Sequence, residues 1–131
     1  MLKITRKVEY ALIALRHMQS KDGDYLTSAK EIADFYGVPK QLLAKTLQQM
    51  SKNDIVEAVQ GASGGYRIKA NLSRISLKDF FEKLEGPIGV MDCYFDTDCQ
   101  INDCNIQTPI QRINNNIRQM LSSMSLKEIT Q

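Results

Sequence analysis

Three cysteines stand close together in the second half of the chain, at Cys93, Cys99 and Cys104, and no other cysteine occurs among the 131 residues. Thiolates from one short segment can meet at a single soft metal centre, because little loop-closure entropy opposes their approach. Three cysteines cannot all pair within one monomer, so a disulfide framework is disfavoured. The spacing therefore predicts a metal site in a loop. The elements ahead of that loop must indicate what such a site controls.

Charge is divided unevenly along the chain. Residues 1–75 contain twelve Lys and Arg against seven Asp and Glu, whereas the remainder contains five against eight. A basic front half suits a polyanion such as DNA, although an ordinary solvated surface can have the same composition. The length supports one globular core with a protruding element. No signal-like start and no apolar run of membrane-spanning length is present, so we expect a cytoplasmic protein without a membrane partner.

Helix-start and helix-stop residues divide the first fifty residues into three predicted helices. Thr5 begins the first helix, which extends to about residue 19. Ser28 and Glu31 form a capping box that opens the second, in which each side chain satisfies the other residue's backbone donor. Gly37 ends that helix because glycine allows a left-handed exit, and Pro39 suits the first turn of the third helix. The segment therefore reads as a helix, a short glycine turn and a helix.

The two helices around the turn have an inner and an outer face. The pattern predicts apolar side chains on the inner face at Ile32, Phe35, Leu42, Leu43, Leu47 and Met50. It leaves Lys40, Gln41, Lys45 and Gln48 on the outer face. An αα-hairpin that binds no nucleic acid would have the same pattern, so the following segment has to decide between the two.

That segment predicts a β-hairpin. A β-branched run at residues 55–59 is followed by a glycine-rich tip and a second short strand at residues 66–69. A helix-turn-helix followed at once by a hairpin is the layout of a winged helix, whose second helix enters the major groove of DNA while the wing lies along the backbone or minor groove. Tip glycines let main-chain N–H groups approach phosphates. The predicted DNA contacts are Lys3, Arg6, Lys30, Lys40, Gln41, Lys45, Gln60, Gly61, Ser63, Gly64, Tyr66 and Arg67.

Two further helices are predicted after the hairpin. A fourth helix runs from Ser76 to Gly86. The last begins at Thr108 as its N-cap, with Pro109 in the first turn. Apolar residues then recur at steps of four and three, at Ile106, Ile110, Ile113, Ile117, Met120 and Met124. Such a stripe fits a partner helix from a second subunit, although packing onto its own domain is the alternative.

The predicted fold class is mainly α with a small β-hairpin wing. We expect a winged helix-turn-helix with its supporting helix at residues 1–86 and a cysteine loop at 87–105. A dimerisation helix and tail would follow at 106–131. The sequence contains no paired nucleophile and base, no phosphate-binding loop and no convergent pair of carboxylates, so an enzyme is not expected.

Together these features resemble the Rrf-two family of bacterial winged-helix transcription regulators. The likeness is carried by Glu9-Tyr10-Ala11-Leu12, the helix-turn-helix, Gly64-Gly65-Tyr66 of the wing, the cysteine loop and the long last helix. It implies a homodimer that binds a palindromic double-stranded DNA operator. It also implies an iron–sulfur cluster, 2Fe-2S or 4Fe-4S, on the three cysteines. The state of that cluster would set operator affinity in response to iron–sulfur status, nitric oxide or redox stress.

The fourth ligand of such a cluster differs within the family. IscR-like members offer a histidine three residues after the last cysteine, where this chain has Gln107, a poor iron ligand. Four residues separate Cys99 from Cys104, where the family commonly has five. The single histidine, His17, falls in the first predicted helix, where a core or surface role is commoner than a ligand role. Glu9 matches the position from which NsrR-like members supply a carboxylate across the dimer. A favourable interaction with the helix dipole is the alternative role for Glu9.

The residues around the cysteines leave several centres open. Aspartates beside the thiols disfavour bare thiolates, whereas the positive charge of bound iron would hold the sulfurs deprotonated. Zinc bound by three cysteines and a carboxylate would give a closed structural site. A cluster-free regulator that responds to a small effector or to thiol oxidation is a further alternative.

Overall fold

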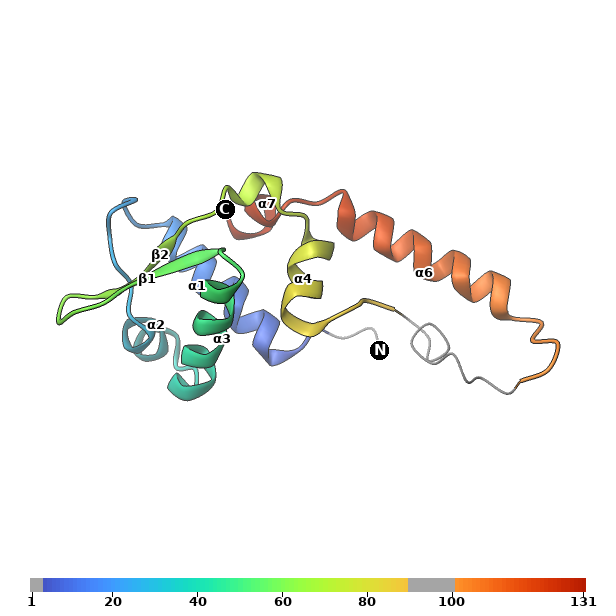
Figure 1. The fold of residues 1–131 in the computed structure, drawn as a ribbon, viewed down its shortest axis with the longest axis horizontal. Coiled ribbons are helices and arrows are strands. Elements are labelled where there is room, and N and C mark those ends of the chain that lie inside the picture. Colours follow the sequence, from blue (N-terminus) through green and yellow to red (C-terminus); the bar gives the residue numbers. More distant parts are fainter. Residues whose placement is uncertain (1–3, 90–100) are drawn as a thin grey trace.

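The computed structural model describes residues 4–89 and 101–131, so Lys3, Cys93 and Cys99 lie outside the described residues. The elements in chain order are α1 (Arg6–Gln19), α2 (Ala29–Tyr36), α3 (Lys40–Lys52), β1 (Val56–Val59), β2 (Gly65–Ile68), the 3-10 helix η1 (Leu72–Arg74), α4 (Leu77–Glu85), α6 (Gln107–Ser122) and α7 (Leu126–Thr130). The prediction of a mainly helical chain with one hairpin is confirmed. Figure 1 shows α1 to α4, the hairpin and α7 gathered in one body, from which α6 extends as an arm.

Short polar side chains begin three of the helices, as predicted. Thr5, Ser28 and Ser76 each accept a hydrogen bond from the backbone N–H three residues further on. Gly37 ends α2 in the left-handed conformation, with φ of 69°, which a residue with a β-carbon rarely adopts. These local signals therefore fix the helix-turn-helix, and the glycine turn directs α3 away from α2.

Two of the expectations for α2 are wrong. Phe35 does not face inward, because its side chain is 72% exposed and the buried residues of the helix are Ile32 and Ala33. Successive residues of a helix are about 100° apart, so burying Ala33 turns Phe35 toward the outside. The capping box is only half formed. The Glu31 carboxylate receives its hydrogen bonds from Tyr25 and His17, which compete with a return to the Ser28 amide.

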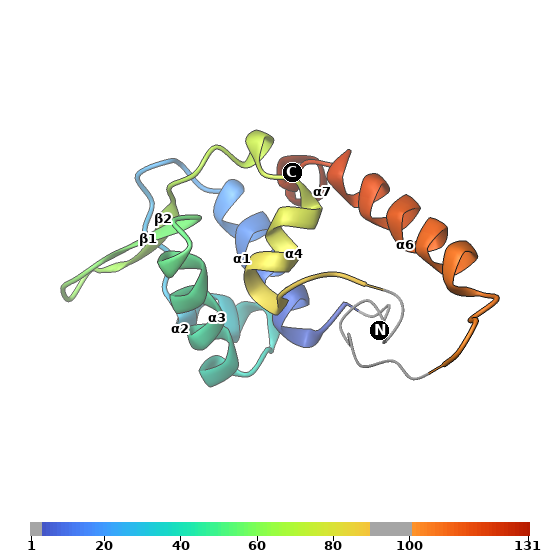
Figure 2. The ribbon, with the colours of Figure 1, turned by 45° about the vertical axis from the view of Figure 1, so that its right-hand side comes forward.

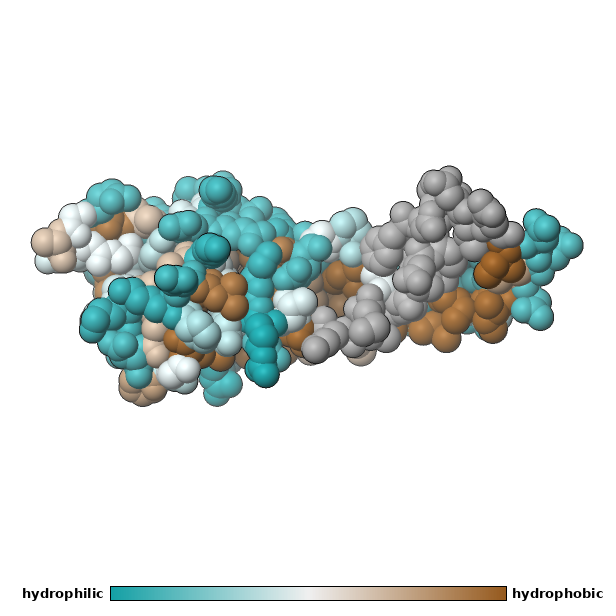
Figure 3. Space-filling model, turned by 90° about the horizontal axis from the view of Figure 1, so that it is seen from below, coloured by the Kyte–Doolittle hydropathy of each residue, from teal (hydrophilic) through white to brown (hydrophobic). Residues whose placement is uncertain are grey.

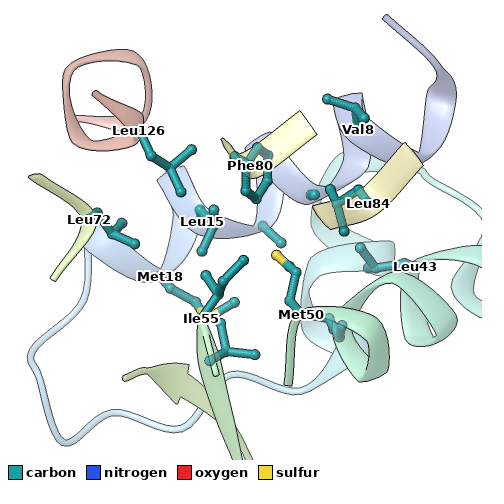
Figure 4. Packing of buried hydrophobic residues seen from close by; sticks show 14 of the residues in the cluster. Val8, Leu15, Met18, Leu43, Met50, Ile55, Leu72, Phe80, Leu84 and Leu126 are labelled. Carbon is teal, nitrogen blue, oxygen red and sulfur yellow. The ribbon is translucent and has the colours of Figure 1, made fainter. Parts of the chain in front are cut away.

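The hydrophobic core is built by residues from distant parts of the chain (Figure 4). Phe80 of α4 and Leu15 of α1 are fully buried beside Met50 of α3 and Ile55, which precedes β1. Leu126 of α7 is also fully buried in this cluster. Burial of side chains of this size stabilises the fold by about 1.5–3 kcal/mol each. The C-terminal helix is therefore part of the core that supports the helix-turn-helix.

The hairpin is fastened to the body through a third backbone segment. β1 and β2 pair antiparallel, and Thr27 forms a bridge to Tyr66 with backbone hydrogen bonds of 2.8 and 2.9 Å. A β-carbon at Gly65 would lie 2.9 Å from the Thr27 carbonyl oxygen, and one at Gly64 would lie 2.1 Å from the carbonyl oxygen of Val59. Both glycines are therefore required by the close approach of the backbone. We call β1, β2 and the connecting residues 60–64 the wing.

The arm, which comprises residues 101–106 and α6, runs back toward the body and ends at α7. α6 begins at Gln107 with Ile106 as its cap residue and no side-chain capping bond, so the predicted cap at Thr108 is wrong. Leu126 N–H then donates to the carbonyl of Ile75 at 2.7 Å, which anchors α7 beside η1 and α1. The sequence pattern did not separate α7 from the terminal helix. Within the two described ranges, no helix is long and apolar enough to span a membrane.

Candidate nucleic-acid interface and cysteine site

The outer face of α3 carries the polar residues that the sequence placed there. Leu43 and Leu47 anchor the helix in the core, whereas Lys40, Gln41 and Lys45 are exposed. Among the described residues, no ion pair involves Lys40 or Lys45. Their ammonium groups are therefore available to phosphates or to the acceptor groups of bases.

Three other predicted DNA contacts form ion pairs with acidic neighbours that the sequence analysis did not connect to them. The guanidinium group of Arg6 lies 2.9 Å from a carboxylate oxygen of Glu9. The corresponding distances are 2.9 Å for Lys30 and Asp34, and 2.5 Å for Arg67 and Glu57. The hydrogen bond to Asp34 also raises the pKa of Lys30. The charge on these three residues is thus partly balanced within the protein.

The wing has an exposed tip and a packed base. Gln60, Gly61 and Ser63 are exposed at the tip, and Gly64 is half-buried. Tyr66 is also half-buried, since its side chain packs against the core and its backbone pairs with Thr27. Figure 1 shows the wing, α2 and α3 at the end of the molecule opposite the arm. Predicted contacts from α3 and the wing thus come from one end of the body.

A buried polar network, which the sequence analysis did not identify, fixes α1 against α2. His17 is 6% exposed; its Nε2 lies 2.6 Å from a Glu31 carboxylate oxygen and its Nδ1 lies 2.9 Å from the Tyr36 hydroxyl. The Tyr25 hydroxyl donates to the other Glu31 oxygen at 2.6 Å. Partial burial raises the pKa of Glu31, but the hydrogen bonds from Tyr25 and His17 outweigh it and leave that pKa below its ordinary value. The network therefore favours an ionised carboxylate between the two helices.

The predicted cluster ligands lie far apart within one chain where the structure describes them. Cys104 is a free, half-buried thiol in the segment at the outer end of the arm (Figures 1 and 2). Glu9 lies in the first turn of α1, on the body, with its side chain 41% exposed. Within residues 4–89 and 101–131, no three His, Cys, Asp or Glu side chains converge as a metal site. Because Cys93 and Cys99 fall outside those ranges, the three-cysteine site stays a prediction.

The two faces of α6 differ in an unexpected way. The Arg118 guanidinium binds Glu82 of α4 at 2.8 Å, Asn114 is buried, and Leu121 packs against the core. Ile106, Ile113 and Met120 form a separate apolar row at a spacing of seven residues, and each is about half exposed. Hydrophobic side chains are visible along this arm in Figure 3. The stripe predicted from the sequence is thus only partly used by the chain's own body.

One protein family matches nearly the whole chain. Its sequence model, described as Rrf2, iron-dependent transcriptional regulator, matches residues 4–131. The chain belongs to the Rrf2 family. The resemblance inferred from the wing, the cysteine loop and the terminal helix is thereby confirmed. As an Rrf2 protein, the chain is a transcription regulator with a DNA-binding winged helix, and the expectation that it is not an enzyme is also confirmed.

Solved structures support the fold of this Rrf2 regulator. CymR (YrzC), titled the global cysteine regulator of B. subtilis, is 26% identical with a TM-score of 0.78, and the alignment covers 99% of this chain and 97% of CymR. A transcriptional regulator of Listeria innocua is 24% identical with a TM-score of 0.80, covering 97% and 85%. T. potens IscR is 23% identical with a TM-score of 0.74, covering 98% and 85%. The body and the arm are therefore both features of known structures.

Proposed function

We propose that this Rrf2 protein is a homodimeric regulator whose affinity for a palindromic operator is set by an iron–sulfur cluster on Cys93, Cys99 and Cys104. The cluster would be 2Fe-2S or 4Fe-4S and would answer to iron–sulfur status, nitric oxide or redox stress. The observation that carries the proposal is that, among the described residues, a free cysteine and a row of half-exposed apolar side chains occur on the same arm, away from the end that carries the wing.

The apolar face of α6 supports the homodimer. A surface helix normally buries its apolar stripe against its own domain, yet α6 buries polar Asn114, pairs Arg118 with Glu82 of α4 and leaves Ile113 and Met120 half exposed. A second copy of the same helix would cover the exposed stripe in an isologous contact. A two-fold dimer also presents two winged helices, which matches the symmetry of a palindromic operator.

The available donors fit an iron–sulfur cluster. Cysteine thiolates are the usual ligands of such clusters, and a carboxylate oxygen from Glu9 would complete four ligands. Glu9 lies on the body while Cys104 lies at the outer end of the arm, so this ligand set requires Glu9 of the partner subunit. To bind the cluster, Glu9 would have to break its ion pair with Arg6.

Metal analysis of anaerobically purified protein tests this function. We expect iron and acid-labile sulfide together with visible absorption, and we expect their loss when Cys93, Cys99 or Cys104 is replaced by Ala. Glu9→Gln should perturb the visible absorption spectrum. Glu128→Gln, which changes an exposed residue of α7, should leave that spectrum unchanged. Full iron, sulfide and colour in all three cysteine variants would contradict the assignment of the ligands.

Thiol oxidation without a cluster is the second candidate function. It is favoured by the half-buried, free thiol of Cys104, which an oxidant could reach. This candidate predicts protein without iron or sulfide whose operator affinity changes on oxidation and recovers with a thiol reductant. A zinc-stabilised site predicts bound zinc instead, with no response to oxidant at constant metal content.

A further inference from the structure

The last turn of α4 accepts hydrogen bonds from side chains of two other helices. A helix end leaves backbone carbonyl groups without intrahelical partners. Gln49 of α3 donates its side-chain amide to the carbonyl of Lys83 at 3.3 Å and to that of Leu84 at 3.1 Å. Lys7 of α1 donates to the same Leu84 carbonyl at 3.2 Å. The position of this turn is therefore coupled directly to α3 and to α1.

The chain leaves this turn at once for the cysteine segment. Gly86 follows α4 with φ of 87°, and Ile88 stands five residues ahead of Cys93. The Arg118 guanidinium donates to the Ile88 carbonyl at 2.8 Å and to the Glu82 carboxylate at 2.8 Å. Arg118 thus ties the start of the cysteine segment, the arm and α4 together with a single side chain.

Gln49 stands at the opposite end of this connection, on the helix that carries the predicted base contacts. It is half-buried and donates to α4, and because it follows Lys45 by four residues it is a neighbour of that exposed lysine on the helix surface. Because protein interiors are close-packed, a shift of the α4 turn is transmitted through these bonds rather than absorbed locally. A displacement that begins near Ile88 would therefore reorient α3.

From these contacts we infer that Arg118 and Gln49 are positioning residues that relay the state of the cysteine segment to α3. The inference rests on the proposed function, since it requires that this state alters DNA binding. Through its bonds to Ile88 and Glu82, Arg118 would pass a displacement of the cysteine segment to α4. Gln49, which is bonded to the Lys83 and Leu84 carbonyls, would then pass the displacement of α4 to α3. Neither residue is among the predicted cluster ligands or the predicted DNA contacts.

Variants that remove the donors test the relay. Gln49→Met keeps the length of the side chain without its donor, and Arg118→Met removes the guanidinium. The matched control is Arg112→Met, an exposed arginine on the same helix. The measurement is the ratio of operator dissociation constants in the two states of the cysteine segment. These states are cluster-loaded and cluster-free protein, or oxidised and reduced thiols if iron and sulfide are absent.

In Gln49→Met and in Arg118→Met, the ratio of the two operator dissociation constants should be closer to one than in the wild type. Arg112→Met should keep the wild-type ratio. Allosteric ratios of about 5 to 150 are typical, so the loss is measurable. The cofactor spectrum should stay unchanged, and Gln49→Lys, which restores a donor, should recover part of the ratio. A wild-type ratio above one that both variants retain would overturn the relay alone. A wild-type ratio of one would overturn the proposed function and the relay with it.

Discussion

Arg67 and Glu57 face each other directly across the wing, with Nε of the arginine 2.5 Å from a carboxylate oxygen. The sequence assigned Arg67 to DNA, and the structure gives it an acidic partner that a phosphate would have to replace. Both side chains are partly exposed, so the pair is screened by solvent and holds the arginine only weakly.

This pair predicts opposite effects for its two members. Arg67→Ala should weaken operator binding and reduce the salt dependence of the binding constant by about one unit, as expected for one lost phosphate contact. Glu57→Gln should strengthen binding, because it leaves the guanidinium without its competing carboxylate. Fluorescence anisotropy over a range of salt concentrations measures both effects. Unchanged affinity in both variants would place the wing away from the phosphates.

The dimer prediction concerns Ile113, which lies in the middle of the exposed stripe of α6. Ile113→Glu would put a charge into the proposed interface, and its desolvation should shift the protein toward monomer. Gln119→Glu adds the same charge at an exposed polar position of the same helix and serves as the control. Sedimentation velocity distinguishes the species. A stable dimer in the Ile113 variant would show that another surface holds the subunits together.

The contribution of α7 to the core can be measured through Leu126. Leu126→Ala should lower the free energy of unfolding by about 2–5 kcal/mol, because it removes a fully buried side chain and leaves a cavity. Lys127→Ala, at the exposed neighbouring position, should stay within about 0.5 kcal/mol of the wild type. Urea denaturation followed by circular dichroism gives both values. A small loss for Leu126→Ala would mean that α7 is dispensable.

Glu31 predicts a dependence of stability on acid pH. Its folded pKa lies below the ordinary value of 4.5, since hydrogen bonds from Tyr25 and His17 outweigh the opposing effect of burial. Between the two pKa values the unfolded chain binds more protons. The stabilisation is therefore complete above pH 4.5 and is lost as the pH falls through the folded value. In thermal unfolding scans, the melting temperature of Glu31→Gln should therefore fall less steeply with decreasing pH than that of Glu128→Gln. Equal slopes would indicate that Glu31 is not the responsible group.

Local signals in the sequence predicted much of the body. The caps at Thr5, Ser28 and Ser76 and the left-handed Gly37 act over a few residues, so spacing alone reveals them. Tertiary contacts were harder to foresee. Phe35 was expected inside by periodicity, but the packing of Ala33 determines which side of α2 is buried.

The candidate site was predicted less completely than the fold, because its residues act through distant partners. The exposure of Lys40 and Lys45 follows from helix periodicity, and the structure agrees. The hydrogen-bond partners of Glu31 are His17 on α1 and Tyr25 in the loop before α2, and no local sequence pattern predicts either of them. Likewise, Arg118 of α6 binds Glu82 of α4, a residue far away along the chain, and no local pattern predicts that pair. The cysteine prediction lies largely outside the described residues.

The central claim is that the cysteine-bound cluster controls operator affinity. Its most direct test is an anaerobic titration of one selected operator with cluster-loaded and cluster-free wild-type protein at the same salt concentration. We predict dissociation constants that differ by about 5- to 150-fold, and we expect Cys104→Ala, taken through the same cluster-loading treatment, to bind like the cluster-free wild-type protein. Equal dissociation constants for the loaded and cluster-free protein would contradict the account.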